Sequence, residues 1–137
     1  MPSSPRRRDR WFRPCLWAFR VTITLAAVIY LFQAVTAGQF LDGDYAFLRV
    51  HLMGATVGDI TMFSALIATA CLKWVARGPL TPFLGVLGAI VVAQAQVTAG
   101  FNRMIWLHVP LGVVLIGLVW ALAWSAWAAK AWQRPRR

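Results

Sequence analysis

The sequence is dominated by four long, predominantly apolar stretches, at about residues 16–37, 47–75, 82–99 and 104–129. A helix needs about 20 apolar residues to cross the hydrocarbon core of a bilayer, which is roughly 30 Å thick. Hydrophobic residues make up 60% of the 137-residue chain and charged residues only 13%, whereas a soluble domain carries about a quarter charged residues. The sequence therefore predicts an integral membrane protein, and it excludes a disordered chain.

Short connections join these stretches, at residues 38–46, 76–81 and 100–103. Consecutive helices with short connections become antiparallel neighbours. We therefore expect an all-α fold, an up-down-up-down four-helix membrane bundle over residues 16–130. Basic tails are expected at residues 1–15 and 131–137.

Lysine and arginine are divided unequally between the two sides of the predicted spans. Twelve of the 14 lie in the tails, at the start of the first span, around the 76–81 connection or at the end of the fourth span, and only Arg49 and Arg103 lie on the other side. Because cytoplasmic loops carry the excess of basic residues, both termini are expected in the cytoplasm and the protein in a bacterial inner (plasma) membrane. Anionic lipid headgroups account for the basic tails, so the net charge of +10 does not require nucleic acid.

A short motif occurs twice and suggests two repeated helix hairpins. Val-Thr-Ala-Gly stands at residues 35–38 and again at 97–100, near the ends of the first and third spans. Each copy is followed by an arginine, a histidine and a glycine in the same order: Arg49, His51 and Gly54, then Arg103, His108 and Gly112. Parallel repeats of this kind are common in membrane proteins.

His51 and His108 are the only histidines of the chain, and each lies about five residues inside its predicted span. At 1.5 Å per residue, both are expected about 7 Å below the same end of the bundle. The second and fourth spans run in the same direction and occupy diagonal corners, so the two imidazoles should face each other. This geometry suits the iron of a b-type haem, with one histidine on each side as axial ligand.

Glycine follows each histidine by about one helical turn. Gly54 is three residues after His51, and Gly112 is four residues after His108. At 3.6 residues per turn, each glycine shares a face with its histidine. A flat helix surface without side chains would leave room for a macrocycle, so both glycines are candidate haem contacts.

Arg49 and Arg103 are the two basic residues expected on the outer side, close in sequence to the histidines. The guanidinium group forms paired hydrogen bonds with carboxylates. Haem propionates are carboxylates that would point toward this interface, so both arginines are candidate haem contacts.

A family resemblance can be stated on these residues. The chain resembles one four-helix half of haem A synthase over roughly residues 21–129, and the stretch 86–118 carries most of the similarity. In that family a helix ending in this way is followed by an outer loop and a histidine that opens the next span. The residues that carry the resemblance are Gln94, Gln96, Thr98, Gly100 and the Leu-His-Val-Pro-Leu-Gly run at 107–112. The chain is also similar to small bacterial four-span proteins with one histidine on each of spans two and four. The resemblance implies haem binding on a four-helix bundle.

One departure from haem A synthase limits what the resemblance implies. That family implies a catalytic glutamate on its first span, and this sequence contains no glutamate. Oxidation of a haem methyl group is therefore not expected. Two axial histidines would also leave no iron position for a substrate, so the sequence does not predict an enzyme.

The leading expectation is therefore a small b-type haem membrane protein that transfers electrons or handles haem near the outer leaflet. Its partners would be the lipid bilayer and a redox partner or membrane complex, and it could form a homo-oligomer. The alternative is a structural or accessory membrane subunit without cofactor, in which the histidines only make hydrogen bonds. A small transporter fits less well, because a single acid inside the spans is little for a coupled pathway.

That acid is Asp59, in the second span. It could relay protons, or it could be a neutral hydrogen-bonded contact with a polar side chain such as Thr61, Gln94 or Gln96. Five polar residues of the spans are expected to link helices by hydrogen bonds, namely Gln33, Thr36, Gln94, Gln96 and Thr98. Zinc is not favoured at the histidines, because a pair lacks the third and fourth ligands that zinc requires.

Overall fold

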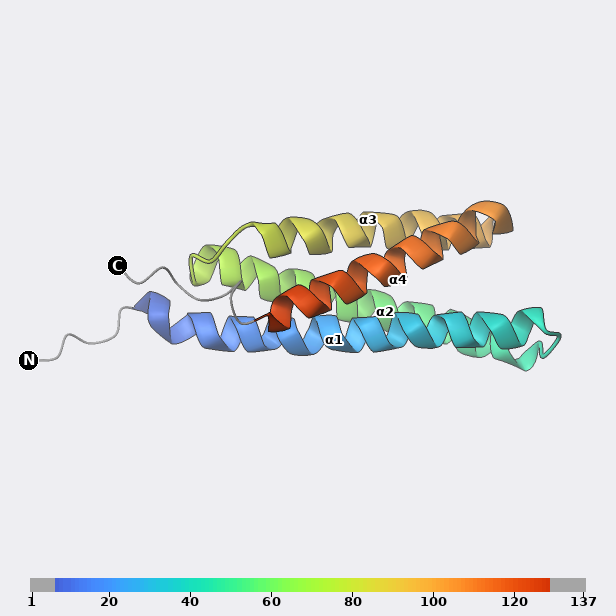
Figure 1. Cartoon of the computed structure of the whole chain (residues 1–137), viewed down its shortest axis with the longest axis horizontal. Helices are drawn as coiled ribbons and strands as arrows, with labels where there is room; N and C mark the ends of the chain where they lie inside the picture. The colour runs from blue at the N-terminus through green and yellow to red at the C-terminus, as the bar shows by residue number, and fades with distance from the viewer. Residues whose placement is uncertain (1–6, 129–137) are drawn as a thin grey trace, which may run out of the picture.

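The computed structural model describes residues 7–128, with side chains from residue 10 onward. This part of the chain is all helical apart from short connections. Its helices are α1 (Arg7–Leu41), α2 (Ala46–Ala70), α3 (Thr81–Phe101) and α4 (Ile105–Trp127), and α2 continues into the π-helical turn η1 (Cys71–Val75). The expected all-α four-helix bundle is confirmed (Figure 1).

All four helices are long and apolar enough to cross a membrane, over Arg10–Leu41, Ala46–Val75, Thr81–Phe101 and Ile105–Trp127. Many large apolar side chains point away from the bundle, and Ile67 and Trp124 are 69% and 80% exposed. Apolar surface of this extent would be unfavourable in water. The architecture fits a multi-pass membrane protein.

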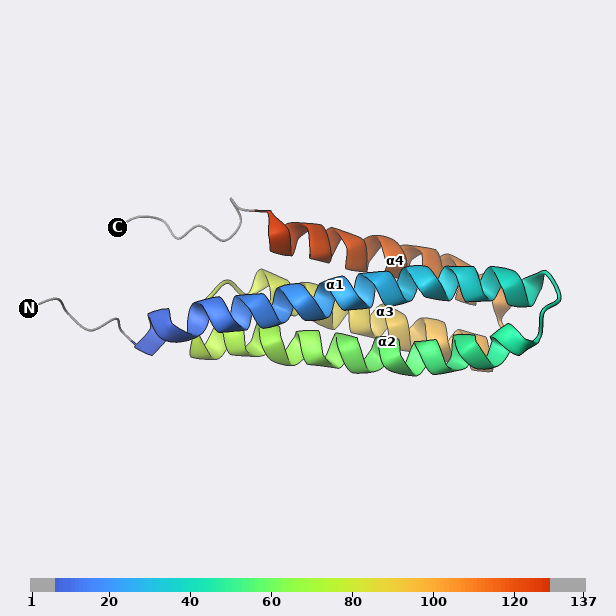
Figure 2. The same ribbon diagram turned by 90° about the horizontal axis from the view of Figure 1, so that it is seen from below.

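The helices follow one another around the bundle. Helix α1 packs against α2 and α4, and α3 packs against the same two helices, so α2 and α4 stand at opposite corners, as the up-down order predicts. The described chain begins and ends at the same end of the bundle (Figures 1 and 2). We call this the termini end, and the opposite end, which carries the 42–45 and 102–104 connections, the two-loop end.

Two of the helix ends differ from the sequence-based bounds. Gly38, expected to open the first connection, lies within α1, which continues to Leu41. The chain turns instead at Gly43, whose φ of 105° lies in a region that glycine adopts readily. The N-terminal end of α1 also differs, because the helix begins at Arg7, inside the segment 1–15 that was expected as a basic tail. The second tail, residues 131–137, lies outside the described residues.

Arg20 ties α1 to α4 at the termini end. Its Nε donates a hydrogen bond to the carbonyl oxygen of Ala126, at 2.8 Å. Its guanidinium also lies 5.5 and 5.0 Å from the ring centres of Trp17 and Trp127, which is within the range of cation–π attraction. The arginine therefore has both a carbonyl and two aromatic partners toward this end of the bundle.

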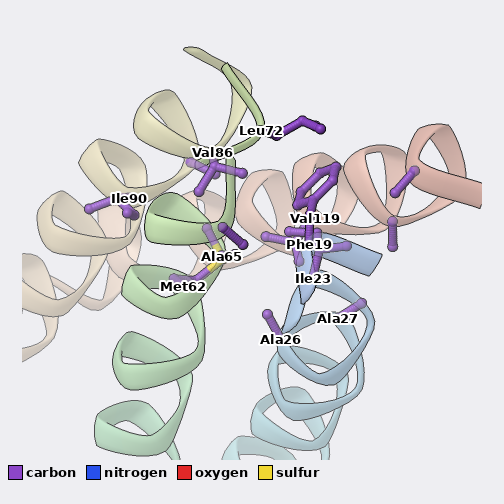
Figure 3. Packing of buried hydrophobic residues seen from close by; sticks show 14 of the residues in the cluster. Phe19, Ile23, Ala26, Ala27, Met62, Ala65, Leu72, Val86, Ile90 and Val119 are labelled. Atoms are coloured by element: carbon purple, nitrogen blue, oxygen red, sulfur yellow. The ribbon is translucent and has the colours of Figure 1, made fainter. Parts of the chain in front are cut away.

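The buried hydrophobic cluster fills only the half of the bundle next to the termini end. Figure 3 shows its centre, where Phe19 and Ile23 of α1 lie close to Val119 of α4, with side chains of α2 and α3 beside them. The cluster extends over residues 15–30, 62–76, 86–93 and 115–126. Since apolar burial is the main stabilising contribution in the protein interior, this half is the hydrophobic core of the bundle, and the other half is built differently.

Candidate functional site

The interior of the two-loop half is lined by polar side chains and glycine. Among its described residues, 31–61 and 94–114, the single buried hydrophobic residue is Ala99, whereas Gln33 and Thr36 are buried and polar. His51 and His108 are half-buried in the same region. A bundle interior without large apolar side chains is the part of this fold where cofactor sites are built from facing helices.

His51 and His108 meet across the bundle. Their ring centres are 6.3 Å apart, and the ring planes are inclined by 65°. His51 comes from the second turn of α2 and His108 from the first turn of α4, which occupy opposite corners. The two-loop half therefore brings the only two histidines of the chain into one contact.

Two hydrogen bonds determine the tautomer of His108. Its Nδ1 lies 2.7 Å from the backbone oxygen of Gln96, and its Nε2 lies 3.2 Å from Nε2 of the same glutamine. A carbonyl oxygen can only accept, so Nδ1 of His108 carries the hydrogen and donates it. The Nε2 lone pair then accepts from the Gln96 side chain. The ring is thereby held with its metal-binding nitrogen unprotonated.

His51 is held in the same tautomer by Thr36 of α1. Nδ1 of His51 is 3.0 Å from Oγ1 of Thr36, and that oxygen is 3.0 Å from the backbone oxygen of Gln33. The Thr36 hydroxyl donates its one hydrogen to the carbonyl, so it accepts from the Nδ1–H of His51. Metal-ligating histidines usually have this second-shell arrangement, in which one ring nitrogen donates to an oxygen and the other faces the metal.

The spacing of the two ring centres matches that of two imidazoles on one metal ion, for which both Nε2 atoms would have to face each other. A metal–imidazole bond is about 2.0 Å long, so two nitrogens on one ion lie about 4 Å apart and the ring centres behind them about 6 Å apart. The observed 6.3 Å agrees with this value. Within the described residues no three His, Cys, Asp or Glu side chains come together, so the donor set suits a group that brings its own remaining ligands, as haem does.

The glycines next to the histidines lie under glutamine side chains of the preceding helices. A Cβ added at Gly54 would overlap the amide of Gln33, and one at Gly112 would lie 3.5 Å from Nε2 of Gln96. The helix surface beside each histidine is therefore not open. The surface is covered by flexible glutamine side chains, which would have to rotate to admit a macrocycle.

The amide of Gln33 is the most unusual polar group of this region. The residue is 8% exposed, and neither its Nε2 nor its Oε1 has a hydrogen-bond partner among the described residues. A buried amide without partners costs on the order of 1–3 kcal/mol. Groups of this kind often mark a place for water or a ligand, and this one lies on Gly54, one turn from His51.

The two candidate arginines lie at the two-loop end with exposed side chains. Arg49 belongs to the first turn of α2, and Arg103 follows the end of α3. Arg103 has a φ of 57°, and the amides of Arg103 and Met104 donate to the carbonyls of Gly100 and Ala99. This is the capping geometry that normally selects glycine, so an arginine here is strained.

The sequence repeat is only partly reproduced in the contacts. Thr36 is buried and bonded to His51, whereas Thr98, its counterpart in the second motif, is exposed and bonded to the carbonyl oxygen of Gln94. Gly100 packs on His108, where an added Cβ would lie 2.7 Å from Nδ1, whereas at Gly38 it would meet no described atom within 4 Å.

Gln33, Thr36 and Gln96, expected as helix contacts, lie beside the histidines, a place that the sequence did not indicate. Nor did the sequence indicate that Tyr30 is buried. The repeated motif was the available signal for Thr36. For Gln33, Gln96 and Tyr30, only the rotation of the helices shows which residues face inward.

The chain matches no protein family, no curated protein and no solved structure in three comparisons.

Proposed function

We propose that the protein is a small b-type haem-binding membrane protein, with His51 and His108 as axial ligands, that transfers electrons or handles haem near the outer leaflet. The observation that carries this proposal is the pair of imidazoles with ring centres 6.3 Å apart, both held as the Nδ1–H tautomer. A bound haem supplies a one-electron couple inside the bilayer.

The chain's own residues divide the work of such a site. Thr36 and the Gln96 carbonyl orient the two rings and keep each Nε2 unprotonated. Gly54 and Gly112 give access to the space beside them, once the amides of Gln33 and Gln96 rotate away. Arg49 and Arg103, exposed at the two-loop end, would pair with propionate carboxylates through charge-assisted hydrogen bonds.

The proposed orientation follows from the charge distribution. Of the nine lysine and arginine residues in the described part of the chain, all but Arg49 and Arg103 lie toward the termini end of the bundle. We therefore assign the termini to the cytoplasm of a bacterial inner membrane and the histidine pair to the outer half. A redox partner would then approach from the two-loop end, where Arg49 and Arg103 are also exposed.

One observation favours the alternative of a structural or accessory subunit without cofactor. Both ring nitrogens of His108 already have partners in Gln96, so this histidine is satisfied as a hydrogen-bonded helix contact. For haem to bind, the Gln96 side chain must give up the bond to Nε2 of His108. The hydrogen bond from Nδ1 of His108 to the backbone oxygen of Gln96 can remain.

An absorption spectrum distinguishes the two functions. The protein is expressed in haem-replete cells, purified in detergent, and its spectrum is recorded oxidised and after dithionite reduction. Two imidazole ligands should give low-spin iron, with a Soret band and sharp α and β bands in the reduced form. Protein without a Soret band, also after addition of hemin, would support the structural subunit instead.

A further inference from the structure

Asp59 is a half-buried residue in the middle of α2, beside a polar seam that is formed by Tyr30, Gln33, Thr36 and His51. Its Oδ1 accepts a hydrogen bond of 3.2 Å from Nε2 of the exposed Gln94 on α3. On the α1 side, the ring of Tyr30 packs on Gly58, where an added Cβ would lie 3.3 Å from the ring carbons. Tyr30 is also close enough to Asp59 for the two groups to interact electrostatically.

The seam contains three buried polar atoms without partners. They are the hydroxyl oxygen of Tyr30 and both amide atoms of Gln33. Tyr30, Gln33 and Thr36 recur every three residues on α1 and face Gly58, Gly54 and His51 of α2, in that order. Buried atoms of this kind are normally satisfied by internal water. The polar seam therefore connects Thr36 and His51 with the surroundings of Asp59 through groups that can hold water.

We propose that Asp59 is the proton-binding site of this protein, and that its carboxylate binds a proton more tightly when one electron is added to the His51–His108 site. The inference rests on the proposed function, since it requires a redox centre at the histidines. The electron comes from a one-electron donor and the proton from water. One O–H bond forms at the carboxylate, and no bond of the protein breaks.

The helices around Asp59 present few other groups that could bind this proton. The titratable neighbour of Asp59 on α1 is Tyr30. Its neighbour on α3 is Gln94, whose amide does not titrate. Within the described chain, the other titratable groups facing the polar seam are His51 and His108. An acid within a membrane span is costly when charged and is usually functional, so a carboxylate with a single amide donor is suited to take up a proton.

The distance between Asp59 and the histidine site sets how strongly the added electron favours proton binding. Asp59 is eight residues after His51, which corresponds to about 12 Å along α2. At an effective dielectric constant of about 20, two unit charges at that separation change an equilibrium by about tenfold. For a one-electron couple, a tenfold change equals about 59 mV. The coupling between the electron and the proton is therefore large enough to be measured in the midpoint potential, and small enough to leave haem binding intact.

The test is a redox titration of the haem-loaded protein at an electrode over a series of pH values. The wild-type midpoint potential should fall by about 59 mV in total as pH rises. Asp59→Asn should keep the high potential at every pH, because it removes the carboxylate charge. Asp42→Asn is the matched control, since it removes an equal charge from an exposed connection and should keep the wild-type dependence.

Gln94→Leu separates proton binding from a purely structural role. Loss of the amide donor makes the charged carboxylate less favourable. The pH range over which the midpoint potential changes should therefore move upward, while the total change in potential stays the same. A wild-type potential that does not depend on pH, or a dependence that survives in Asp59→Asn, overturns the inference and leaves haem binding intact.

A second readout does not use haem. In His51→Ala protein without haem, infrared spectroscopy should detect the carbonyl stretch of a protonated carboxyl group that disappears in Asp59→Asn. The band should shift in Tyr30→Phe, because the tyrosine hydroxyl belongs to the same polar seam. Absence of the band at every pH overturns the proton site. Absence of haem from the wild type overturns the proposed function and this inference together.

Discussion

The imidazole rings of His51 and His108 lie 6.3 Å apart, centre to centre, although their helices stand at opposite corners of the bundle. This approach is possible because no large apolar side chain is buried between the helices in the described part of the two-loop half. Each ring is fixed by an oxygen of the preceding helix, from Thr36 or Gln96.

Replacement of either axial histidine should remove haem. In His51→Ala or His108→Ala, the iron would lose one of its two protein bonds, so the Soret band per protein should largely disappear. The measurement is the ratio of Soret to protein absorbance after purification in the presence of hemin. Retention of a normal low-spin spectrum in both single variants would refute axial ligation by this pair.

Thr36→Val should weaken haem binding by about 10–100-fold, because loss of the hydrogen-bond partner of a ligating histidine has effects of this size. The valine cannot accept the hydrogen bond from Nδ1 of His51. Thr98→Val provides a matched control, since Thr98 holds the equivalent place in the repeated motif but bonds only to Gln94. Hemin titration of the haem-free proteins measures both effects. Equal losses in the two variants would contradict the role of Thr36.

Gly54→Ala should be close to neutral, because displacement of the flexible Gln33 side chain offsets the gain of alanine over glycine in a helix. The added methyl group would overlap the amide of Gln33. In a Gln33→Ala background the same change should be stabilising, because alanine favours a helix interior over glycine by roughly 0.5–1 kcal/mol. Unfolding in detergent provides the four free energies of the double-mutant cycle. Additive effects would show that the two residues are not in contact.

Arg103→Gly should change stability and haem retention in opposite directions. Glycine adopts the left-handed conformation observed at this position without the cost of up to about 1–2 kcal/mol that other residues incur. The helix end should therefore become more stable, while loss of a propionate partner lowers haem affinity. Arg49→Gln should lower affinity without the gain in stability. Unchanged hemin affinity in both variants would remove the arginines from the site.

The topology can be tested independently of haem. A reporter fused after Arg137 should behave as cytoplasmic, and one inserted at Gly43 as periplasmic, because basic residues concentrate at the termini end. The opposite pattern would move the histidine pair to the cytoplasmic half and exclude a role near the outer leaflet.

The sequence by itself determined the four helices, their antiparallel order and the placement of both histidines near one end of the bundle. These properties depend on local quantities, namely the length of each apolar stretch and the brevity of each connection. The same quantities placed α2 and α4 at opposite corners and the histidines opposite each other. Only the positions of the helix ends shifted, as at Gly38, which continues α1 instead of ending it.

Only the tertiary structure decided which polar groups surround the histidines. Helices that are apolar on all sides present no hydrophobic stripe that would identify the inward face, so the sequence could not distinguish Thr36 from Thr98 or place Gln33 on Gly54. These contacts depend on how each helix is rotated about its own axis. That rotation is set by close packing in the termini half, around Phe19, Ile23 and Val119, and it turns Tyr30, Gln33 and Thr36 toward the glycines and the histidine of α2.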